Sequence, residues 1–446
     1  MEIVATRDYN QCVKNKDSKI KNSDTLIKNP LRKAAVEIME AGLQAIDTKH
    51  AIKEGIKLEN NHLFIKETSY ALDKIKRIFV VGVGKCSLEA ALALEDILGD
   101  KLTDGIVIDL VCNETPKKIK FCQGDHPFPT ENNVDSTKKI IDLLENSEES
   151  DLIIFIISGG GSTLLCQPDN FTCFQESDMV SCLMGAGANI IEINTVRKHL
   201  SLARGGYLAK YAFPAKSISL IFSDVGSDME FVASGPTIKD SSTIEDAKLV
   251  IEKYSANTAC GFDINNLIET PKDDKYFENV KNILFLSNTT ALNKMAEKAS
   301  ELGFDSEIKT NDLKGEAREI GEQIAKEINK AKINKVLICG GETTVTARKL
   351  GRGGRNQELV LSASRFINDD CLVAAINSDG WDNTDFAGAL CDNLTIKRIR
   401  ELNMDTSEFL AGNTSYNFFE KVGDYFRTGL TGSNVADLIL AIKKNE

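Results

Sequence analysis

The stretch "IIFIISGGGSTLL", residues 153–165, passes from a run of apolar residues into three glycines with a serine on each side. The six consecutive apolar residues 152–157 are typical of a strand that is buried on both faces of a sheet. Segment 158–162 then allows the backbone to turn tightly and to present N–H groups, and a helix is expected near Thr163. Two interpretations are open: a flexible tight turn, or a cradle for an anion such as a phosphate or a carboxylate.

Similar strand-like runs alternate with helical segments along most of the chain. These runs occupy residues 77–84, 105–112, 152–158, 218–224, 282–288, 335–341 and 371–379. Strands that alternate with helices predict parallel, doubly wound sheets of the α/β class. Because a chain of 446 residues is too long for one ordinary hydrophobic core, two domains are expected.

The domain boundary is placed in the polar segment 255–280, which lacks a clear apolar pattern. Residues 1–28, which include a lysine-rich polar stretch, are expected to form a peripheral extension. The pair Asn29–Pro30 then begins a helix in the preferred way, with a cap followed by proline. The predicted α/β domains are therefore 29–270 and 271–446.

The two halves of the chain contain similar short segments. "FIISGGGSTLL" (155–165) has a counterpart in "LICGGETTVTA" (337–347), and "LIFSD" (220–224) has one in "AINSD" (375–379). Open α/β sheets bind ligands at the loops that follow their strand ends. Unless the similarity arose by chance, each half presents a ligand-binding edge.

The composition limits the classes of partner. A formal net charge of −12 argues against nucleic acid or an anionic membrane, although it is compatible with a local basic pocket for an anionic substrate. The eleven cysteines form no C-x-x-C pair and the four histidines form no H-x-x-x-H motif, which argues against structural zinc and favours a reducing compartment. No apolar run approaches the ~20 residues of a membrane span, and the N-terminus lacks a signal-peptide core. We therefore expect a cytoplasmic protein.

The turn "VVGVGKCS", residues 80–87, matches neither common nucleotide-binding motif. A Walker A loop would need glycine in place of Phe79 and serine or threonine in place of Cys86. The dinucleotide fingerprint needs an acidic residue about 20 positions on, and the nearest candidate, Asp109, is expected inside a strand. What remains is a strand–glycine–helix turn, in which Lys85 is either solvated or neutralises a phosphate together with the helix N-terminus.

A second glycine-rich turn contains arginines. In "KLGRGGRNQELVLSA", residues 349–363, Arg352 and Arg355 lie among glycines before a helix that is expected to open near Asn356. Glycines let the backbone approach a ligand, and a guanidinium fork binds phosphate or carboxylate at two points. We favour an anion site here over an ordinary surface turn.

A third group of cations lies in "INTVRKHLSLARGGYLA", residues 193–209. Arg197, Lys198 and Arg204 surround a predicted helix in this segment. In an acidic protein they could supply the positive field of an anion-binding pocket. The alternative is an ordinary charged helix face.

Carboxylates follow two of the predicted strands. Asp224 and Asp379 each come directly after a strand and its serine. Such groups hold Mg²⁺ through oxygen, often with waters that complete the coordination shell. The nearby Asp228, Asp382 and Asp385 are interpreted as turn residues.

Taken together, these motifs resemble those of the class II glycerate kinases, or glycerate 2-kinases, with their C-terminal MOFRL module. The similarity extends from about Pro30 to Leu440 and preserves the order of the motifs. The departures are mild, because an alanine-like residue is usual where Cys86 stands and a Pro-Gly turn where Val225 and Gly226 stand. The blocks that carry the similarity are "GDHPFPTENN" (124–133), "SGGGSTLL" (158–165), "GANIIEINTVRKHLS" (187–201), "SDVGSDMEFVASGPT" (223–237), "GGETTVTARKLGRGGRNQE" (340–358), "NSDGWDNTDFAGA" (377–389) and "TGLTGSNVADL" (428–438).

The resemblance implies two Rossmann-like α/β domains with the active site in the cleft between them. It also implies transfer of the ATP γ-phosphoryl group to the 2-hydroxyl of D-glycerate, with Mg²⁺, to give 2-phosphoglycerate and ADP. Lys85 and Arg355 would stabilise the transferring phosphoryl group from opposite sides of the cleft. Asp224 and Asp379 would hold Mg²⁺, or one of them would accept the hydroxyl proton. The residues expected to bind substrate or phosphate are Gly84, Ser158, Gly159, Gly160, Gly161, Ser162, Arg197, Lys198, Gly340, Gly341, Glu342, Thr343, Arg352 and Asn356.

The implied partners are D-glycerate and ATP, with no nucleic acid and no membrane, and both a monomer and a homodimer fit the sequence. Two other functions stay open. A hydroxypyruvate reductase-type oxidoreductase would need a nicotinamide site, and the unmatched fingerprint at residues 80–87 counts against it. A non-catalytic sugar-phosphate-binding protein would use the same strand–glycine–serine turns without turnover.

Overall fold

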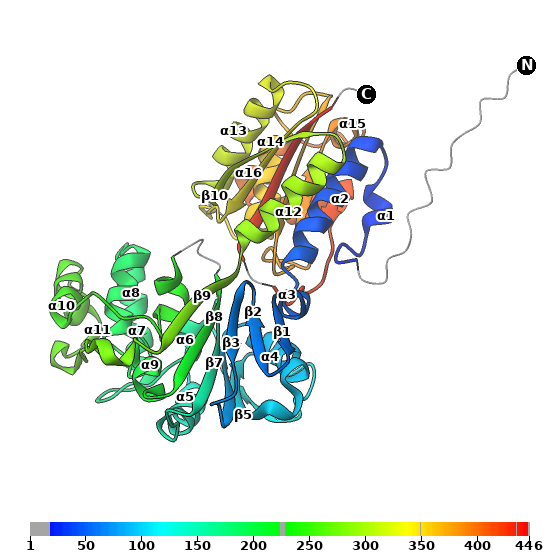
Figure 1. Ribbon diagram of the computed structural model, residues 1–446. Coiled ribbons are helices and arrows are strands. Elements are labelled where there is room, and N and C mark those ends of the chain that lie inside the picture. Colours follow the sequence, from blue (N-terminus) through cyan, green and yellow to red (C-terminus); the bar gives the residue numbers. More distant parts are fainter. Residues whose placement is uncertain (1–17, 224–227, 348, 434, 445–446) are drawn as a thin grey trace, which may run out of the picture. The chain divides into compact units, whose positions relative to one another are not determined.

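The computed structural model describes residues 18–223, 228–347, 349–433 and 435–444 (Figure 1). The chain divides into two compact units. One comprises residues 46–287 and 432–435, and we call it the 46–287 unit. The other comprises residues 1–45, 288–431 and 436–446, and we call it the 288–431 unit.

The 46–287 unit is built on a six-stranded sheet in which all neighbouring strands are parallel. In spatial order its strands are β6 (Ile119–Gln123), β5 (Leu102–Asp109), β4 (Arg77–Val83), β7 (Asp151–Ser158), β8 (Lys216–Ser223) and β9 (Val280–Ser287). Every residue of β7 is buried, as its unbroken apolar run predicts. The expectation of a parallel α/β sheet is confirmed for this unit.

Helices cover both faces of this parallel sheet. Phe79, Val81 and Val83 of β4 belong to one apolar cluster with residues of α5 (Glu131–Glu145) and α9 (Tyr207–Ala212). The intervening residue Gly82 points to the opposite face, where a Cβ would lie 3.2 Å from Ser87 Cβ at the start of α4 (Ser87–Leu98). The sheet is therefore doubly wound.

The remaining elements of this unit surround the sheet. A second apolar cluster joins α7, α8, α10 and α11, and β1, β2 and β3 form a small antiparallel sheet. Their bounds are α3 (Thr48–Gly55), β1 (Ile56–Glu59), β2 (His62–Ile65), β3 (Thr68–Ala71), α6 (Gly161–Leu164), α7 (Cys173–Gly185), α8 (Ile190–Lys198), α10 (Ile244–Lys253) and α11 (Ala256–Cys260).

The 288–431 unit has a six-stranded sheet of mixed direction. In spatial order its strands are β10 (Asp305–Leu313), β11 (Lys335–Gly341), β15 (Asp437–Lys443), β12 (Cys371–Asn377), β13 (Gly388–Cys391) and β14 (Tyr425–Phe426). β10 and β11 are parallel, but β15 lies antiparallel between β11 and β12. The expectation of a wholly parallel sheet is wrong here, because β15 in the centre of the sheet and β13 near its edge both run opposite to their neighbours.

Helices also cover both faces of the mixed sheet. α2 (Pro30–Ala45) and α12 (Asn288–Glu301) pack against each other and against the central strands, and Figure 1 shows them side by side. α13 (Ala317–Lys330) and α14 (Arg355–Ala363) share the apolar cluster of the other face. The remaining helices of this unit are α1 (Ser23–Leu26), α15 (Asn393–Glu401), α16 (Thr406–Gly412) and α17 (Ser415–Val422). The α/β fold class is thus confirmed for both units.

The predicted domain division, 29–270 and 271–446, differs from these units. The helix predicted at Asn29–Pro30 forms as α2, but it belongs to the 288–431 unit. The guanidinium of Arg32 on this helix is fully buried and pairs with Asp392 and Asp424, at 2.6 Å each. Sequence pattern could not reveal this pairing, because the partners lie 360 and 392 residues away.

Two other predicted limits also need correction. β9, which the prediction assigned to the second domain, is hydrogen-bonded to β8 in the parallel sheet of the 46–287 unit. In the described part of the predicted extension 1–28, Ile20 and Leu26 are buried, so this part is not peripheral. Both are apolar residues in a polar stretch, and their burial holds α1 and the residues before it against the protein. Residues 1–17 of the predicted extension lie outside the described residues.

Candidate functional site

The glycine turn after β7 lies beside the turn after the parallel strand β4. Lys85 N–H donates to the carbonyl of Gly159 at 3.0 Å, which links the two turns. Gly84 has φ of 122°, and a Cβ there would lie 2.0 Å from the hydroxyl of Ser158. This Ser158 hydroxyl is buried and donates to the carbonyl of Val83 at 3.4 Å. Gly84, Ser158 and Gly159 therefore hold the two turns together, and we find no contact surface for a ligand on the Ser158 side chain.

The helix expected near Thr163 begins two residues earlier, as the short α6. Gly160 precedes it with φ of 81°, which favours glycine. Gly161 is buried, and a Cβ there would lie 2.6 Å from Ala233 Cβ. The hydroxyl of Ser162 lies 3.1 Å from that of Ser234. Gly160 and Ser162 thus face a cavity, whereas Gly161 makes close packing possible.

This cavity has a volume of about 520 Å³ and is lined by residues of the 46–287 unit alone. Its lining residues are His126, Pro127, Phe128, Pro129, Gly160, Ser162, Thr163, Glu176, Ser177, Val180, Ser181, Met184 and Arg197. Its size falls in the range of small-molecule sites. We call it the Arg197 cavity.

Arg197, on α8, is the cation of this cavity. Its side chain is half-buried and makes no hydrogen bond or ion pair with any residue that the structure describes. Burial, and secondarily the positive charge of Arg204, lowers the pKa of Arg197 to about 10. A buried charge without a partner is costly, so this arrangement favours the binding of an anion.

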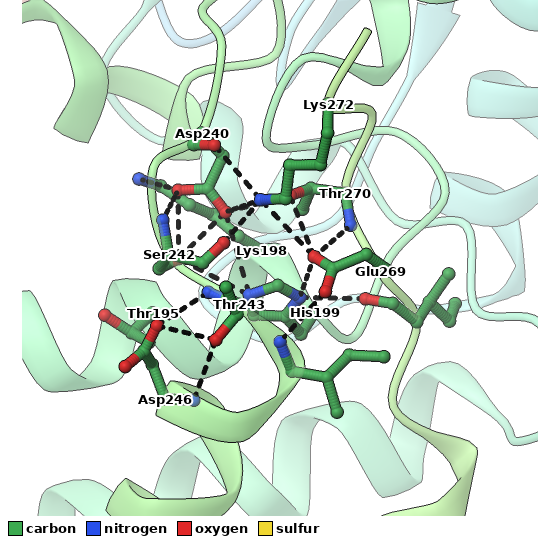
Figure 2. Close-up of polar contacts among 12 residues, drawn as sticks. Thr195, Lys198, His199, Asp240, Ser242, Thr243, Asp246, Glu269, Thr270 and Lys272 are labelled. Carbon is green, nitrogen blue, oxygen red and sulfur yellow. Dashed lines mark hydrogen bonds and ion pairs between the residues drawn. The ribbon is translucent and has the colours of Figure 1, made fainter.

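The other two cations of the predicted cluster have partners inside the protein. Arg204 is fully buried, pairs with Glu176 at 2.6 Å, and donates to the carbonyl of Leu165 at 2.5 Å. Lys198 is buried and pairs with Asp240 at 3.1 Å (Figure 2). The expectation that Lys198 binds substrate or phosphate is therefore not supported, because its charge is neutralised elsewhere.

Figure 2 shows the polar network that holds Lys198 at the end of α8. Asp240 also accepts hydrogen bonds from the hydroxyls of Ser242 and Thr270, at 2.9 Å and 3.1 Å. Burial opposes the ionisation of Asp240, but the charge of Lys198 and the hydrogen bonds from Ser242 hold its pKa below the usual value. The neighbouring His199 is buried and its Nδ1 lies 2.8 Å from the Ile268 carbonyl. The network fixes α8, and with it the position of Arg197.

Lys85 lies next to the Arg197 cavity. A Cβ at Gly160 would lie 3.0 Å from Lys85 Cγ, so the lysine side chain runs along this cavity-lining glycine. The side chain is exposed, and its ammonium has no hydrogen bond or ion pair within the described ranges. The helix N-terminus that follows is not open to a phosphate in the way the sequence suggested. The Leu88 N–H of α4 donates to the buried Asp109 carboxylate at 3.0 Å, and burial raises the pKa of Asp109 to about 6.

His126 is a cavity residue that the sequence did not mark as a candidate. It stood out there only as one of four histidines and as part of the block 124–133. Its ring lines the Arg197 cavity, and burial together with the positive charges of Lys85 and Arg197 lowers its pKa. A lone histidine without metal-ligand spacing gave no signal of this environment.

The 288–431 unit contains its own cavity, with a volume of about 460 Å³. It is lined by Thr343, Thr344, Val345, Ala347, Lys349, Gly351, Gly353, Gly354, Arg355, Glu358, Asn377, Trp381, Asp382, Asn383 and Asn413. The hydroxyl of Thr343 is buried and has no hydrogen-bond partner among the described residues. Trp381 is 52% exposed, which is unusual for tryptophan. We call this the Trp381 cavity.

The N-terminus of α14 begins at Arg355, as expected, but an internal carboxylate caps it. The N–H groups of Asn356 and Gln357 donate to Asp382 at 3.2 Å and 2.9 Å. Asp382, interpreted from the sequence as a turn residue, is buried, and this burial raises its pKa. The expected capture of a ligand anion by Asn356 is not supported, because Asp382 already occupies this helix end.

Arg355 lines the Trp381 cavity, but it has carboxylate partners that the sequence did not reveal. Its guanidinium bonds Asp437 at 2.5 Å and 3.0 Å, and Glu342 at 3.0 Å. Its Nη1 makes no hydrogen bond within the described ranges. Burial raises the pKa of Asp437 to about 7, although Arg355 opposes this shift. The carboxylate of Glu342, which was predicted to contact substrate or phosphate, thus accepts a hydrogen bond from Arg355.

Arg352 is not among the residues that line the Trp381 cavity, although Gly351 and Gly353 on either side of it are. Its guanidinium stacks 3.6 Å from the Tyr416 ring centroid and pairs with Asp385 at 3.1 Å. The two glycines at the end of β11 serve the backbone: at Gly341, with φ of 144°, a Cβ would lie 2.2 Å from Leu313 N, and at Gly340 it would lie 3.0 Å from a side-chain atom of the buried Leu292. Contacts within the protein therefore account for the residue types found at Arg352, Gly340 and Gly341.

Of the two aspartates predicted to hold Mg²⁺, only Asp379 lies within the described residues. Asp224 lies outside the described residues. Asp379 accepts a hydrogen bond from Trp381 N–H at 2.8 Å, as a turn residue does. The described ranges contain no group of three or more histidine, cysteine, aspartate or glutamate residues that could hold a metal ion. Mg²⁺ that is bound to ATP needs only one or two protein carboxylates. This arrangement is therefore compatible with Asp379 as a Mg²⁺ ligand.

Comparison with known proteins gives the family. Residues 34–269 match the domain of unknown function DUF4147, and residues 335–437 match the MOFRL family. The "Glycerate 2-kinase" of Pyrococcus horikoshii is 35% identical over 94% of this chain and 98% of its own. The "D-glycerate 2-kinase" of Thermotoga maritima is 36% identical over 92% and 98%. A "Putative hydroxypyruvate reductase" of Agrobacterium vitis is 35% identical over 81% and 86%.

A solved structure agrees with these relatives. The crystal structure of the glycerate kinase of Thermotoga maritima matches with a TM-score of 0.81 and 35% identity, over 92% of this chain and 99% of that one. None of the helices in the described ranges combines the length and the apolar character that a membrane span requires. The chain belongs to the glycerate 2-kinase family, with a DUF4147 region followed by a MOFRL region.

Proposed function

We propose that this protein transfers the γ-phosphoryl group of ATP to the 2-hydroxyl of D-glycerate, which yields 2-phosphoglycerate and ADP. The observation that carries the proposal is the pair of cations, Arg197 and Lys85, at one small cavity of an acidic protein. Neither side chain has an internal partner among the described residues. A small anion such as glycerate would neutralise the first, and a transferring phosphoryl group the second.

In this proposal the Arg197 cavity binds glycerate. The guanidinium fork of Arg197 would hold the substrate carboxylate at two points. The hydroxyl of Ser162 and the backbone at Gly160 would contact the remaining oxygens. Lys85, which runs along Gly160, would stabilise the charge that spreads over the phosphoryl oxygens in the transition state.

The Trp381 cavity is proposed as the site of the nucleotide. An exposed indole offers a stacking surface for an adenine base, typically worth about 1–3 kcal/mol. The unpartnered hydroxyl of Thr343 and the Nη1 atom of Arg355 are donors for ribose or phosphate oxygens. Asp379 and Asp224 are the proposed protein ligands of Mg²⁺, which would supply positive charge to neutralise the ATP phosphates.

Other features of the chain are compatible with a cytoplasmic metabolic enzyme. The ten cysteines in the described ranges are all free, as is usual in a reducing compartment. The buried ones, such as Cys86 and Cys391, have pKa values that burial raises, so these thiols are unreactive. We propose the cytoplasm as the location on this basis.

The test is an assay of ADP release with D-glycerate as the phosphoryl acceptor. We expect release of ADP that depends on glycerate, and no NADH oxidation when hydroxypyruvate is supplied instead. NADH oxidation would favour the reductase suggested by the name of the Agrobacterium relative. Tight binding of a sugar phosphate with no ADP release would favour the non-catalytic alternative. L-Glycerate serves as the matched control, because it has the same groups as the substrate and differs only in the configuration at C2, which carries the reacting hydroxyl.

A further inference from the structure

The loop between β6 and α5 presents His126 to the Arg197 cavity and is held firmly on both sides. The buried side chain of Asn133 accepts from Asp125 N–H at 3.0 Å and donates to the Asp125 carbonyl at 3.0 Å. The same amide donates to the Thr163 carbonyl at 3.1 Å, which ties this loop to the end of α6. The position of His126 relative to the glycine turn is therefore set by direct hydrogen bonds.

The charges around His126 favour a neutral imidazole at pH 7. Lys85 and Arg197 face it from the β4–α4 turn and from α8, and both are cationic. The carboxylate of Glu176, on α7, is buried and neutralised by Arg204. The carboxylate of the adjacent Asp125 accepts from the Thr130 hydroxyl at 2.6 Å and from Asn132 at 3.0 Å. Asp125 therefore stays ionised, but the charges that shift the pKa of His126 are those of Lys85 and Arg197, and both lower it.

A neutral imidazole has one nitrogen that accepts a proton. Neither ring nitrogen of His126 makes a hydrogen bond within the described part of the chain, so this acceptor is open to a ligand. The other polar side chains at the cavity are less suited to accept a proton. Arg197 is already protonated, Glu176 is committed to an ion pair, and Ser162 is a weak base. His126 is thus the described cavity residue with a free basic lone pair.

We infer that His126 is the general base that removes the proton from the 2-hydroxyl of glycerate. The inference rests on the proposed function. As the hydroxyl oxygen forms its bond to the γ-phosphorus, the bond from that phosphorus to the β,γ-bridging oxygen of ATP breaks and ADP leaves. The hydroxyl proton passes to the free ring nitrogen of His126, and the resulting imidazolium returns it to solvent after product release. Of the alternatives that the sequence left open, this assigns proton acceptance to neither Asp224 nor Asp379.

The inference has a direct consequence for the pH dependence. Only neutral His126 accepts a proton, so kcat/KM should rise with pH through the pKa of His126 and then stay level. Because burial and the two cations lower this pKa, the midpoint of the rise should lie below the ordinary histidine value of about 6.5. The decline of kcat/KM on the acid side should therefore lie at lower pH in an enzyme that keeps Lys85 and Arg197 than in one that lacks either charge.

The variant that tests this is His126→Gln, which keeps a polar side chain of similar reach but cannot act as a base near neutral pH. We expect kcat to fall by about 10²–10⁴-fold, with KM for glycerate changed by less than about threefold and with the acid limb lost. A general base contributes to the transition state and little to ground-state binding, which explains this split. His50→Gln, on the exposed face of α3, is the matched control and should keep the wild-type profile.

Two further measurements keep the result interpretable. The melting temperature of His126→Gln shows whether it folds, and if it does not, His126→Ala assayed with added imidazole replaces it, with partial recovery of kcat as the expected result. A folded variant with kcat within about threefold of wild type, or with the acid limb intact, overturns the inference. Absence of glycerate-dependent ADP release in the wild-type enzyme would instead refute the proposed function itself.

Discussion

Arg197→Met is expected to lower kcat/KM for D-glycerate by about 10²–10³-fold, which corresponds to roughly 3–4 kcal/mol. The substitution removes the only guanidinium at the Arg197 cavity that has no partner among the described residues. If the fork holds the carboxylate equally in the ground and transition states, most of the loss should appear in KM. Arg197→Lys keeps the charge but not the fork, so it should be clearly impaired as well.

Folding provides an independent readout for this variant. Since burial lowers the pKa of Arg197, the unliganded protein bears a desolvated charge that methionine would remove. The melting temperature of Arg197→Met without ligand should therefore equal or exceed that of wild type. Lys210→Met, an exposed cation on α9, is the control and should retain activity. Normal glycerate kinetics in a folded Arg197→Met protein would show that the carboxylate binds elsewhere.

Lys85→Met is expected to lower kcat by about 10²–10³-fold, or roughly 3–4 kcal/mol, with a smaller change in KM. The ammonium would act chiefly where charge spreads over the phosphoryl oxygens, so its loss should be felt in the transition state. Methionine keeps much of the side-chain volume along Gly160. Because Lys85 is exposed and without an ion pair in the described ranges, the melting temperature should not change.

The control for this second variant is Lys138→Met, an exposed lysine on α5 of the same unit. It removes the same charge from the protein without touching the cavity, and it therefore separates a local effect from a change in the overall field. Steady-state kinetics with both substrates decide the result. A folded Lys85→Met enzyme with kcat within about threefold of wild type would reduce this lysine to a surface residue, because threefold is only ~0.7 kcal/mol.

The sequence predicted the 46–287 sheet well because buried parallel strands are unbroken apolar runs. β7 and β8 are recognisable from composition alone. β10 is half exposed, with charged residues along its length, and gives no such signal. β15 is apolar, but only the folded sheet shows that it runs antiparallel between β11 and β12. Strand order depends on contacts between distant segments, which local patterns do not record.

The candidate site shows the same limit at the level of single residues. Arg197 and Lys198 are neighbours in the sequence, but consecutive residues of a helix point about 100° apart. One therefore reaches the cavity, and the other reaches Asp240. The sequence identified both as cations and could not separate them.

The partner of Arg355 was similarly out of reach of a local pattern. Asp437 lies 82 residues further along the chain, on β15. Glycine spacing correctly located the turn before α14, because a backbone requirement is local. The charge balance inside that turn depends on which distant carboxylates fold against it.

The proposed phosphorylation of the 2-hydroxyl of glycerate is tested most sharply by the identity of the product. Purified enzyme is incubated with D-glycerate, ATP and Mg²⁺, and enolase is then added alone. We predict that enolase consumes the product at once, because 2-phosphoglycerate is its substrate, with phosphoenolpyruvate formed in proportion to ADP. If ADP forms but enolase acts only after a phosphoglycerate mutase is supplied, the 3-hydroxyl is the acceptor and the enzyme is not a 2-kinase.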